Sequence, residues 1–377
     1  MPTTADSFAE TTTSLTASAV IEDALSSLRI AGNVLLRESY LAPWSIAVPA
    51  ASELSGLLGM DPRSTLAAFH LVEYGQCEIA LDRRQRHHLQ AGEMLVCFGG
   101  SAHEISQGNA GRPRPIASLL AGRSGRARAQ PQRSGESTAL LCGVFELHDT
   151  AANPMFAALP RAMRVPLSRP GDMHNLAGVA RLMAEEIDRG APGAVYVVSR
   201  LLEVLCAQAI RSWIESAPAD EAGWFRAIRD PVVGRAVAAI HAEPSLDWTV
   251  ASLAGRVAIS PSRFAARFSE TMGESPMGYV TRWRMTVARR HLRGTQWGIE
   301  QIAQAIGYES PAAFSRSFRR LVGMPPASWR AREAGLAPPG RETSVDRETA
   351  TARKRAPVPP TRPNQEGVGR TVRTTVK

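Results

Sequence analysis

The sequence predicts an α+β chain of several domains, with a β-rich N-terminal half, a helical connector and an all-α C-terminal part. Three observations lead to this prediction. Residues 35–164 alternate apolar and polar side chains between glycines, which is typical of antiparallel strands. Residues 174–213 have the apolar spacing of amphipathic helices. Near the C-terminus one helical pattern occurs twice, about fifty residues apart.

The N-terminal half begins with a Ser/Thr-rich segment, residues 1–29, which we expect to be disordered. The β domain is expected over residues 30–170 as an antiparallel barrel or sandwich. Residues 108–136 are rich in Gly, Pro, Arg and Ser, so we expect most of them to form a loop. The clearest strands are 66–74, 76–81, 93–98 and 139–147, with turns at the glycines between them.

The connector, residues 171–227, is expected to contain helices at 174–188 and 193–213. The second of these has a broad apolar face with Val197, Leu201 and Val204. The width of this face permits packing within one domain, contact between two domains, or contact with a second copy of the chain. The sequence leaves these three roles open.

The duplicated pattern at residues 250–257 and 299–306 has apolar residues at i, i+3, i+4 and i+7, which marks one buried helix face. A short turn follows each copy, and then a Ser-Pro pair that is typical of a helix start. Two phenylalanines at i, i+4 and a closing glycine complete each unit. These residues are Ser260, Pro261, Phe264, Phe268 and Gly273 in the first copy, and Ser310, Pro311, Phe314, Phe318 and Gly323 in the second. The pattern predicts two helix-turn-helix units.

The second helix of each unit supplies the candidates for contact with double-stranded DNA. Arg316 lies in the first two turns and is expected to reach a base edge, whereas Arg319 and Arg320 suit phosphates. A solvated helix face is the alternative interpretation of these arginines. The whole set of candidate DNA-binding residues is Ser262, Arg263, Arg267, Ser315, Arg316, Arg319 and Arg320.

Positive charge is concentrated in the same region. Residues 231–333 contain 14 arginines and 7 acidic residues, a net charge of +7, whereas residues 1–230 have a net charge of −3. This asymmetry favours a nucleic acid as partner. The tail, residues 334–377, is basic and nearly free of large apolar residues, so we expect it to be disordered.

Residues 230–332 resemble the DNA-binding domain of the AraC/XylS transcriptional regulators, through segments 248–254, 275–285 and 302–310 among others. The resemblance implies a domain over residues 228–333, in which one long helix, 276–293, joins both units and sets their recognition helices in successive major grooves about 34 Å apart. Members of that family often have a long polar residue where this chain has Ala266. Base reading by the first unit would then rest on Ser262 and Arg263.

The β domain is similar to the cupin-type N-terminal domain of the same regulators, through Phe69-His70, Gly75, and segments 89–93, 101–103 and 140–143. The resemblance implies a cupin-like antiparallel β-barrel that senses a small-molecule effector, with His70 and His103 as candidate effector contacts. A close His-x-His cluster with a nearby glutamate is absent, so we expect no metal, no cofactor and no catalytic residue. Cys77, Cys97, Cys142 and Cys206 form no C-x-x-C pair and are expected to be reduced core thiols.

The sequence therefore predicts a sequence-specific DNA-binding transcriptional regulator that is not an enzyme. Its expected partners are DNA and an effector, together with RNA polymerase and a second copy of the chain. No run of eighteen apolar residues occurs, so no membrane partner is expected, and the location is expected to be cytoplasmic, with the nucleoid. The alternative is a metal-dependent cupin enzyme with an appended DNA-binding domain.

Overall fold

The structure of the chain is a computed structural model that describes residues 17–61, 64–121, 137–148, 150, 153–168, 176–216 and 223–335. Three segments for which the sequence makes a prediction lie wholly or largely outside these residues. Residues 1–16, the greater part of the expected loop at 122–136, and the expected disordered tail from residue 336 all lie outside the described residues.

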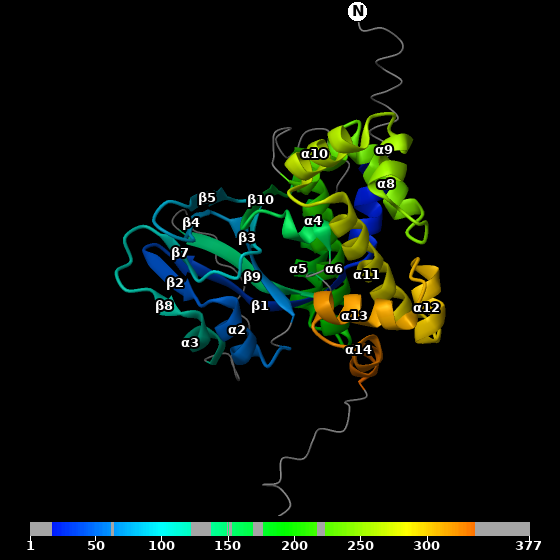
Figure 1. Cartoon of the computed structure of the whole chain (residues 1–377). Helices are drawn as coiled ribbons and strands as arrows, with labels where there is room; N and C mark the ends of the chain where they lie inside the picture. Colours follow the sequence, from blue (N-terminus) through cyan, green and yellow to red (C-terminus); the bar gives the residue numbers. More distant parts are fainter. Residues whose placement is uncertain are drawn as a thin grey trace, which may run out of the picture. The chain divides into compact units, whose positions relative to one another are not determined.

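The N-terminal half contains two separate five-stranded sheets (Figure 1). Neighbouring strands are antiparallel except for the short parallel pair of β2 with β8. Sheet 1 has the order β1 (Arg29–Leu41), β9 (Ser137–His148), β3 (Thr65–Tyr74), β6 (Glu93–Cys97) and β10 (Ala162–Pro166). Sheet 2 has the order β5 (Arg86–Gln90), β4 (Gln76–Ala80), β7 (His103–Gln107), β2 (Trp44–Val48) and β8 (Arg114–Pro115).

Of the two forms that the sequence predicts, barrel and sandwich, the structure has the sandwich. Among the described residues the edge strands β1 and β10 of sheet 1 are not paired with each other, so the sheet stays open. The core between the sheets takes alternate side chains from both of them, including Ala68 and Leu95 from sheet 1 and Ile46 and Ile105 from sheet 2.

Two short helices close the core. Leu54 of α2 (Ala51–Leu58) and Ile116 of α3 (Ile116–Ala121) are both buried in it. Ile116 is anchored in this way, and residues 116–121 form a helix within the segment 108–136, most of which the sequence predicts to be a loop.

The connector helices α5 (Leu176–Arg189) and α6 (Ala194–Ser216) form where the sequence predicts them, and α6 packs on β1 of sheet 1. Gly32 permits this contact, because a Cβ atom there would lie 2.6 Å from the Cβ of Leu202. Leu202 is buried, whereas Val197 and Val204 remain exposed. Core packing thus accounts for one side of α6 and not for the other. The short helix α4 (Pro154–Ala157) precedes β10.

Residues 17–26 form a helix, so the expectation of disorder across residues 1–29 is wrong for the part that the structure describes. Val20, Ala24 and Leu28 are buried. Val20 and Ala24 are four residues apart and lie on one face of this helix, and Leu28 follows just after its end. The expectation failed because three small or medium apolar residues in a Ser/Thr-rich context give little local signal, while the partners that bury them are distant in sequence.

The C-terminal part is all α-helical and contains both expected units. Ser260 and Ser310 accept hydrogen bonds from the amides of Arg263 and Ala313, at 3.4 and 3.2 Å, which confirms them as N-caps. The helices are α7 (Trp224–Arg229), α8 (Val233–Ala242), α9 (Val250–Arg256), α10 (Pro261–Met272), α11 (Pro276–Gly294), α12 (Ile299–Ala305), α13 (Pro311–Val322) and α14 (Pro326–Glu333). The boundary expected at residue 228 lies inside α7.

Two further expectations concern the whole chain. Cys77, Cys97, Cys142 and Cys206 are all buried and none of them is in a disulfide bond, so their place in the core is as expected. In the part of the chain that the structure describes, no helix combines the length and the apolar character needed to cross a membrane.

Candidate nucleic-acid interface and sensor cavity

The recognition helices α10 and α13 each bury two phenylalanines and expose the opposite face. Phe264, Phe268, Phe314 and Phe318 are fully buried, and the rings of each pair have centroids 5.6 Å apart. The residues expected to contact DNA mostly lie opposite. Ser262, Arg263, Arg316, Arg319 and Arg320 are exposed, and Ser315 is half-buried.

The second unit carries three arginines whose charges are available. Among the described residues, no acidic side chain lies within ion-pair distance of Arg316, Arg319 or Arg320. Three unpaired guanidinium groups on one helix face repel one another and attract phosphates. This favours a DNA-contacting face over a solvated one, because solvated faces commonly alternate charges of both signs.

Arg267 differs from the other candidates because its charge is already engaged. Its Nη2 and Nε atoms lie 2.7 and 3.1 Å from Oδ2 of Asp230, and the other carboxylate oxygen accepts from the amides of Val232 and Val233. Burial opposes ionisation of Asp230, but these hydrogen bonds outweigh it and hold the pKa of that carboxyl below its usual value. Arg267 thus ties α10 to the start of α8.

A single helix, α11, carries both units. It has 19 residues, which gives a length of about 28 Å at 1.5 Å per residue. Its Arg284 donates to the backbone oxygens of Pro244 and Leu246 at 2.8 and 2.7 Å, in the loop before the first unit. The same guanidinium lies 5.7 Å over the ring of Tyr308, in the turn of the second unit. Arg284 therefore fastens both units to α11.

The two turns of the units use the left-handed backbone region in different ways. In the second unit Gly307 has φ +78°, and a Cβ atom there would lie 2.5 Å from the carbonyl oxygen of Ser245. In the first unit the corresponding residue is Ala258, at φ +57°. A side chain at positive φ is strained, so the first turn is less relaxed than the second.

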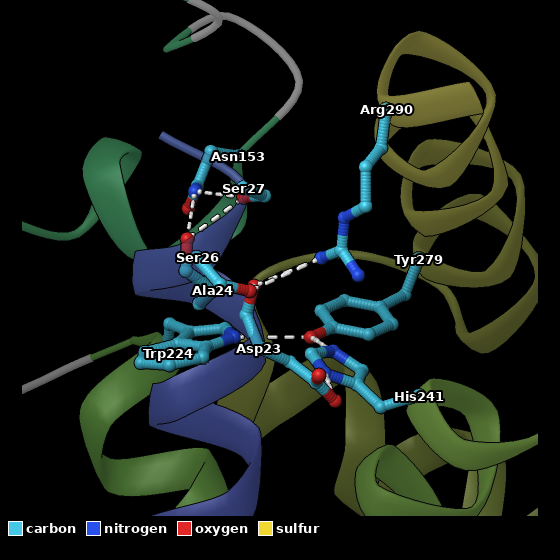
Figure 2. A network of polar contacts seen from close by, with 9 residues as sticks. All are labelled: Asp23, Ala24, Ser26, Ser27, Asn153, Trp224, His241, Tyr279 and Arg290. Atoms are coloured by element: carbon cyan, nitrogen blue, oxygen red, sulfur yellow. Dashed lines mark hydrogen bonds and ion pairs between the residues drawn. The ribbon is translucent and has the colours of Figure 1, made fainter. Parts of the chain in front are cut away.

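A polar network joins the N-terminal helix to α7, α8 and α11 (Figure 2). Trp224 Nε1 donates to the hydroxyl of Tyr279 at 3.0 Å, and this hydroxyl lies 2.9 Å from Nε2 of His241. The Asp23 carboxylate lies 3.6 Å from Nδ1 of the same imidazole. Arg290 donates to the backbone oxygen of Asp23 at 3.3 Å. Asn153, which lies just before α4, also donates to the backbone oxygen of Ala24 at 2.8 Å, so this segment contacts both the C-terminal helices and the cupin half.

His241 occupies the centre of this network. Its ring stacks on Trp283 with centroids 3.5 Å apart. Burial lowers the pKa of His241, although the Asp23 carboxylate acts in the opposite direction. The imidazole is therefore neutral in the folded chain near neutral pH. Sequence reasoning missed this contact, because the segment that holds Asp23 was expected to be disordered.

The two histidines expected to contact an effector lie together in the cupin domain. His70 and His103 are buried, and their Nε2 atoms are 2.7 Å apart. A cavity of about 460 Å³ is lined by His103 and by apolar side chains that include Val48, Leu57 and Ile116. His70 is not among its lining residues, so His103 alone of the pair faces the cavity.

A third side chain joins the histidines. The Sγ of Cys97 and one nitrogen from each imidazole all lie within 4.8 Å of one another. The sequence prediction of no metal considered histidines and glutamates at close spacing and treated Cys97 as a core thiol. The structure brings together three metal-ligating side chains that are distant in sequence.

Two family profiles match the chain. The profile described as "Cupin" covers residues 19–215, and the profile described as "Helix-turn-helix domain" covers residues 253–332. The first one matches more than half of the chain.

Several known proteins are similar over long stretches. The chain is 33% identical over 196 residues to an AraC-like transcription regulator of Streptomyces lividans, a match that spans 52% of this chain and only 64% of that protein. It is 27% identical over 266 residues to the HTH-type transcriptional regulator AlkR of Acinetobacter baylyi, covering 69% of this chain and 86% of AlkR.

Among solved structures, a transcriptional regulator with an AraC-type DNA-binding domain from Chromobacterium violaceum is 28% identical, with a TM-score of 0.27. That match covers 28% of this chain and 93% of the other. The profiles and the relatives agree with the two halves described above. The chain belongs to the cupin family by its N-terminal half, carries a helix-turn-helix domain in its C-terminal part, and is similar to AraC-like transcription regulators.

Proposed function

We propose that this chain is a sequence-specific DNA-binding transcriptional regulator controlled by a small-molecule effector. The observation that carries the proposal is the pair of helix-turn-helix units on one helix, α11, with unpaired arginines on the outer face of α13. The net charge of +7 over residues 231–333 supports it. A protein with this role acts where the chromosome is, so the proposal includes a cytoplasmic, nucleoid-associated location.

We assign different tasks to the exposed arginines. Arg316 lies nearer the N-terminal end of α13, the part of a recognition helix that enters the major groove, so it reads a base edge. Arg319 and Arg320 lie one turn further along and contact phosphates. In the first unit Ser262 and Arg263 take the reading role. Arg267 stabilises the fold through Asp230 and makes no base contact.

We place the effector in the cavity of about 460 Å³ beside His103. Its size is within the usual range for small-molecule sites, and its walls are mostly apolar with a few polar groups. A ligand alters DNA binding only to the extent that it binds one arrangement of the chain better than another. The contacts of residues 17–26 with α8 and α11 offer one element whose position can differ between such arrangements.

We further propose a division of the chain that follows its helices. The cupin domain and connector end with α6, and the DNA-binding part begins with α7 rather than at residue 228.

On α6 the side chains of Val195, Tyr196, Val197 and Val204 are exposed. An apolar edge of this kind supports a homodimer formed through the connector. Analytical ultracentrifugation of wild type and Val195→Asp tests the homodimer, which this substitution should weaken. A contact with RNA polymerase is a separate expectation.

DNA recognition is tested with the whole chain. We expect selection from genomic fragments to enrich one sequence, and binding to weaken steeply with salt. Arg316→Ala is expected to reduce discrimination at one base pair by roughly 1–3 kcal/mol, whereas Arg320→Ala weakens all sequences about equally. Arg181→Ala, at an exposed arginine on α5, is the matched control and should change nothing. Failure of the intact chain to enrich any sequence at low salt would remove the central claim.

We also propose that the chain performs no chemistry on its effector. The relatives named above are transcription regulators, which supports this. The alternative, a cupin enzyme with an appended DNA-binding domain, predicts that the effector is converted during incubation with the protein. Recovery of the unchanged effector after prolonged incubation, measured by mass spectrometry, favours the regulator.

A further inference from the structure

Three side chains that ligate soft metal ions meet between the two sheets of the cupin domain. His70 on β3 and Cys97 on β6 are diagonal neighbours on one face of sheet 1, because Ala68 pairs with Cys97 and His70 with Leu95. His103 is the first residue of β7, in sheet 2. The three ligand atoms lie within 4.8 Å of one another. Each side chain comes from a different strand, so the site is fixed by the sandwich itself.

The hydrogen bonds of His103 orient its ring toward this point. The carbonyl oxygen of Ser101 can only accept, so Nδ1 of His103, 3.0 Å away, carries a proton. Its Nε2 then presents a lone pair toward Nε2 of His70, 2.7 Å away. A backbone carbonyl that holds the outer nitrogen of an imidazole is a common second contact of metal-ligating histidines.

His70 is less well satisfied than its partner. Its Nδ1 is buried and has no hydrogen-bond partner among the described residues. A metal ion bound through Nε2 leaves that Nδ1 unpaired as well, so the site is inferred from the approach of the three ligand atoms alone.

We propose that His70, Cys97 and His103 bind a copper(I) ion. Two imidazoles with a thiolate are ligands for soft or borderline ions, which leaves copper(I) and zinc(II) as the main candidates. Net charge separates them. One thiolate neutralises copper(I), whereas zinc(II) leaves one positive charge, and the described residues add no carboxylate to the group. All three side chains are at most 6% exposed, and an uncompensated buried charge is strongly disfavoured.

Binding needs only small movements. Metal–nitrogen bonds of about 2.0 Å place two ligated nitrogens roughly 3.3–3.5 Å apart, compared with 2.7 Å between the Nε2 atoms here. A cavity of about 10 Å³ lined in part by Cys97, Ser101 and His103 provides room beside them. The ion replaces the thiol proton of Cys97, which passes to solvent, and no electron is transferred. His103 also lines the larger cavity, which gives a route to the site.

The test uses the full-length protein under anaerobic conditions, titrated with copper(I) in competition with a chelator such as bathocuproine disulfonate. We expect one ion per chain, and X-ray absorption should show one sulfur and two nitrogen ligands. Cys97→Ser is expected to weaken binding at least about 100-fold, because it removes the only soft ligand. Cys206 is also a buried free thiol and lies on α6, away from the site. Cys206→Ser is therefore the matched control and should bind copper(I) like wild type.

Several outcomes decide the inference. His103→Gln, which keeps the thiol, should also weaken binding, and circular dichroism confirms that each variant is folded. Equal affinities of wild type and folded Cys97→Ser overturn the site. Zinc(II) binding that depends on Cys97, measured with a zinc indicator in place of copper(I), overturns the choice of metal if copper(I) does not bind. The inference goes beyond the proposed regulator and is measured without DNA, so failure of either leaves the other standing.

Discussion

The turns of the two helix-turn-helix units should respond in opposite ways to exchange of alanine and glycine. Gly307→Ala places a side chain at φ +78°, within 2.5 Å of the Ser245 carbonyl oxygen. The left-handed conformation costs alanine roughly 1–2 kcal/mol. The clash cannot relax cheaply, because Arg284 pins the flanking oxygens of Pro244 and Leu246, and such overpacking adds roughly 1–3 kcal/mol.

Part of this cost is offset because alanine restricts the unfolded chain, by about 0.4–1 kcal/mol. The net expectation for Gly307→Ala is a loss of roughly 2–4 kcal/mol. The reverse exchange at the corresponding position, Ala258→Gly, relieves φ +57°. It should stabilise the first unit by up to about 1 kcal/mol, because glycine also gives the unfolded chain more conformational freedom, which offsets part of the gain.

Native-state hydrogen exchange measures these effects one unit at a time, which matters because a chain of several domains need not unfold in a single step. Protection of amides in α12 and α13 should fall roughly 30- to 900-fold in Gly307→Ala, the equivalent of 2–4 kcal/mol. Protection in α9 and α10 should rise slightly in Ala258→Gly. A change below threefold in the first variant, or a loss of protection in the second, would refute the reasoning.

Other predictions test single contacts. Arg267→Ala should destabilise the chain by about 1–2 kcal/mol, seen as a lower denaturation temperature, yet leave base preference unchanged. A changed base preference would show that Arg267 contacts a base. Phe318→Ala should cost about 3–5 kcal/mol and abolish specific DNA binding, and retained binding would contradict its place in the core. Burial lowers the pKa of His241 from 6.5, so just below pH 6.5 the unfolded chain binds a proton at His241 that the folded chain does not. Stability should therefore hold above about pH 6.5 and fall below it, by up to about 1.4 kcal/mol per pH unit. In His241→Gln the denaturation temperature should depend less on pH, and an unchanged slope would exclude His241 as its source.

The helix-turn-helix units could be predicted because their signals are local. A Ser-Pro start, two phenylalanines at i, i+4 and a closing glycine all lie within one short helix, and each acts on neighbouring residues. The strands around Gly75 and Gly92 were predictable for the same reason, since both glycines have positive φ in tight turns. Local patterns also place α5 and α6, but do not say which side of α6 meets the sheet.

The remaining features depend on contacts between distant residues. Arg267 was predicted to contact DNA, but the sequence does not show that Asp230, 37 residues earlier, lies beside it. The ligand set of His70, Cys97 and His103 is likewise assembled from both sheets, so no spacing along the chain reveals it. The choice of sandwich over barrel depends on the edges of sheet 1, which strand patterns do not specify.

The contact of Trp224 with Tyr279 determines where this chain can be joined to the cupin domain of another protein. A hybrid that replaced everything before residue 228 would lose the indole that donates to the buried Tyr279 hydroxyl. A junction between α6 and α7 keeps that contact, yet it still separates Asp23 from His241 and Arg290. A biosensor with an exchanged sensor domain should therefore retain residues 17–26 of this chain, although the whole sensor sequence lies between them and the helices they contact.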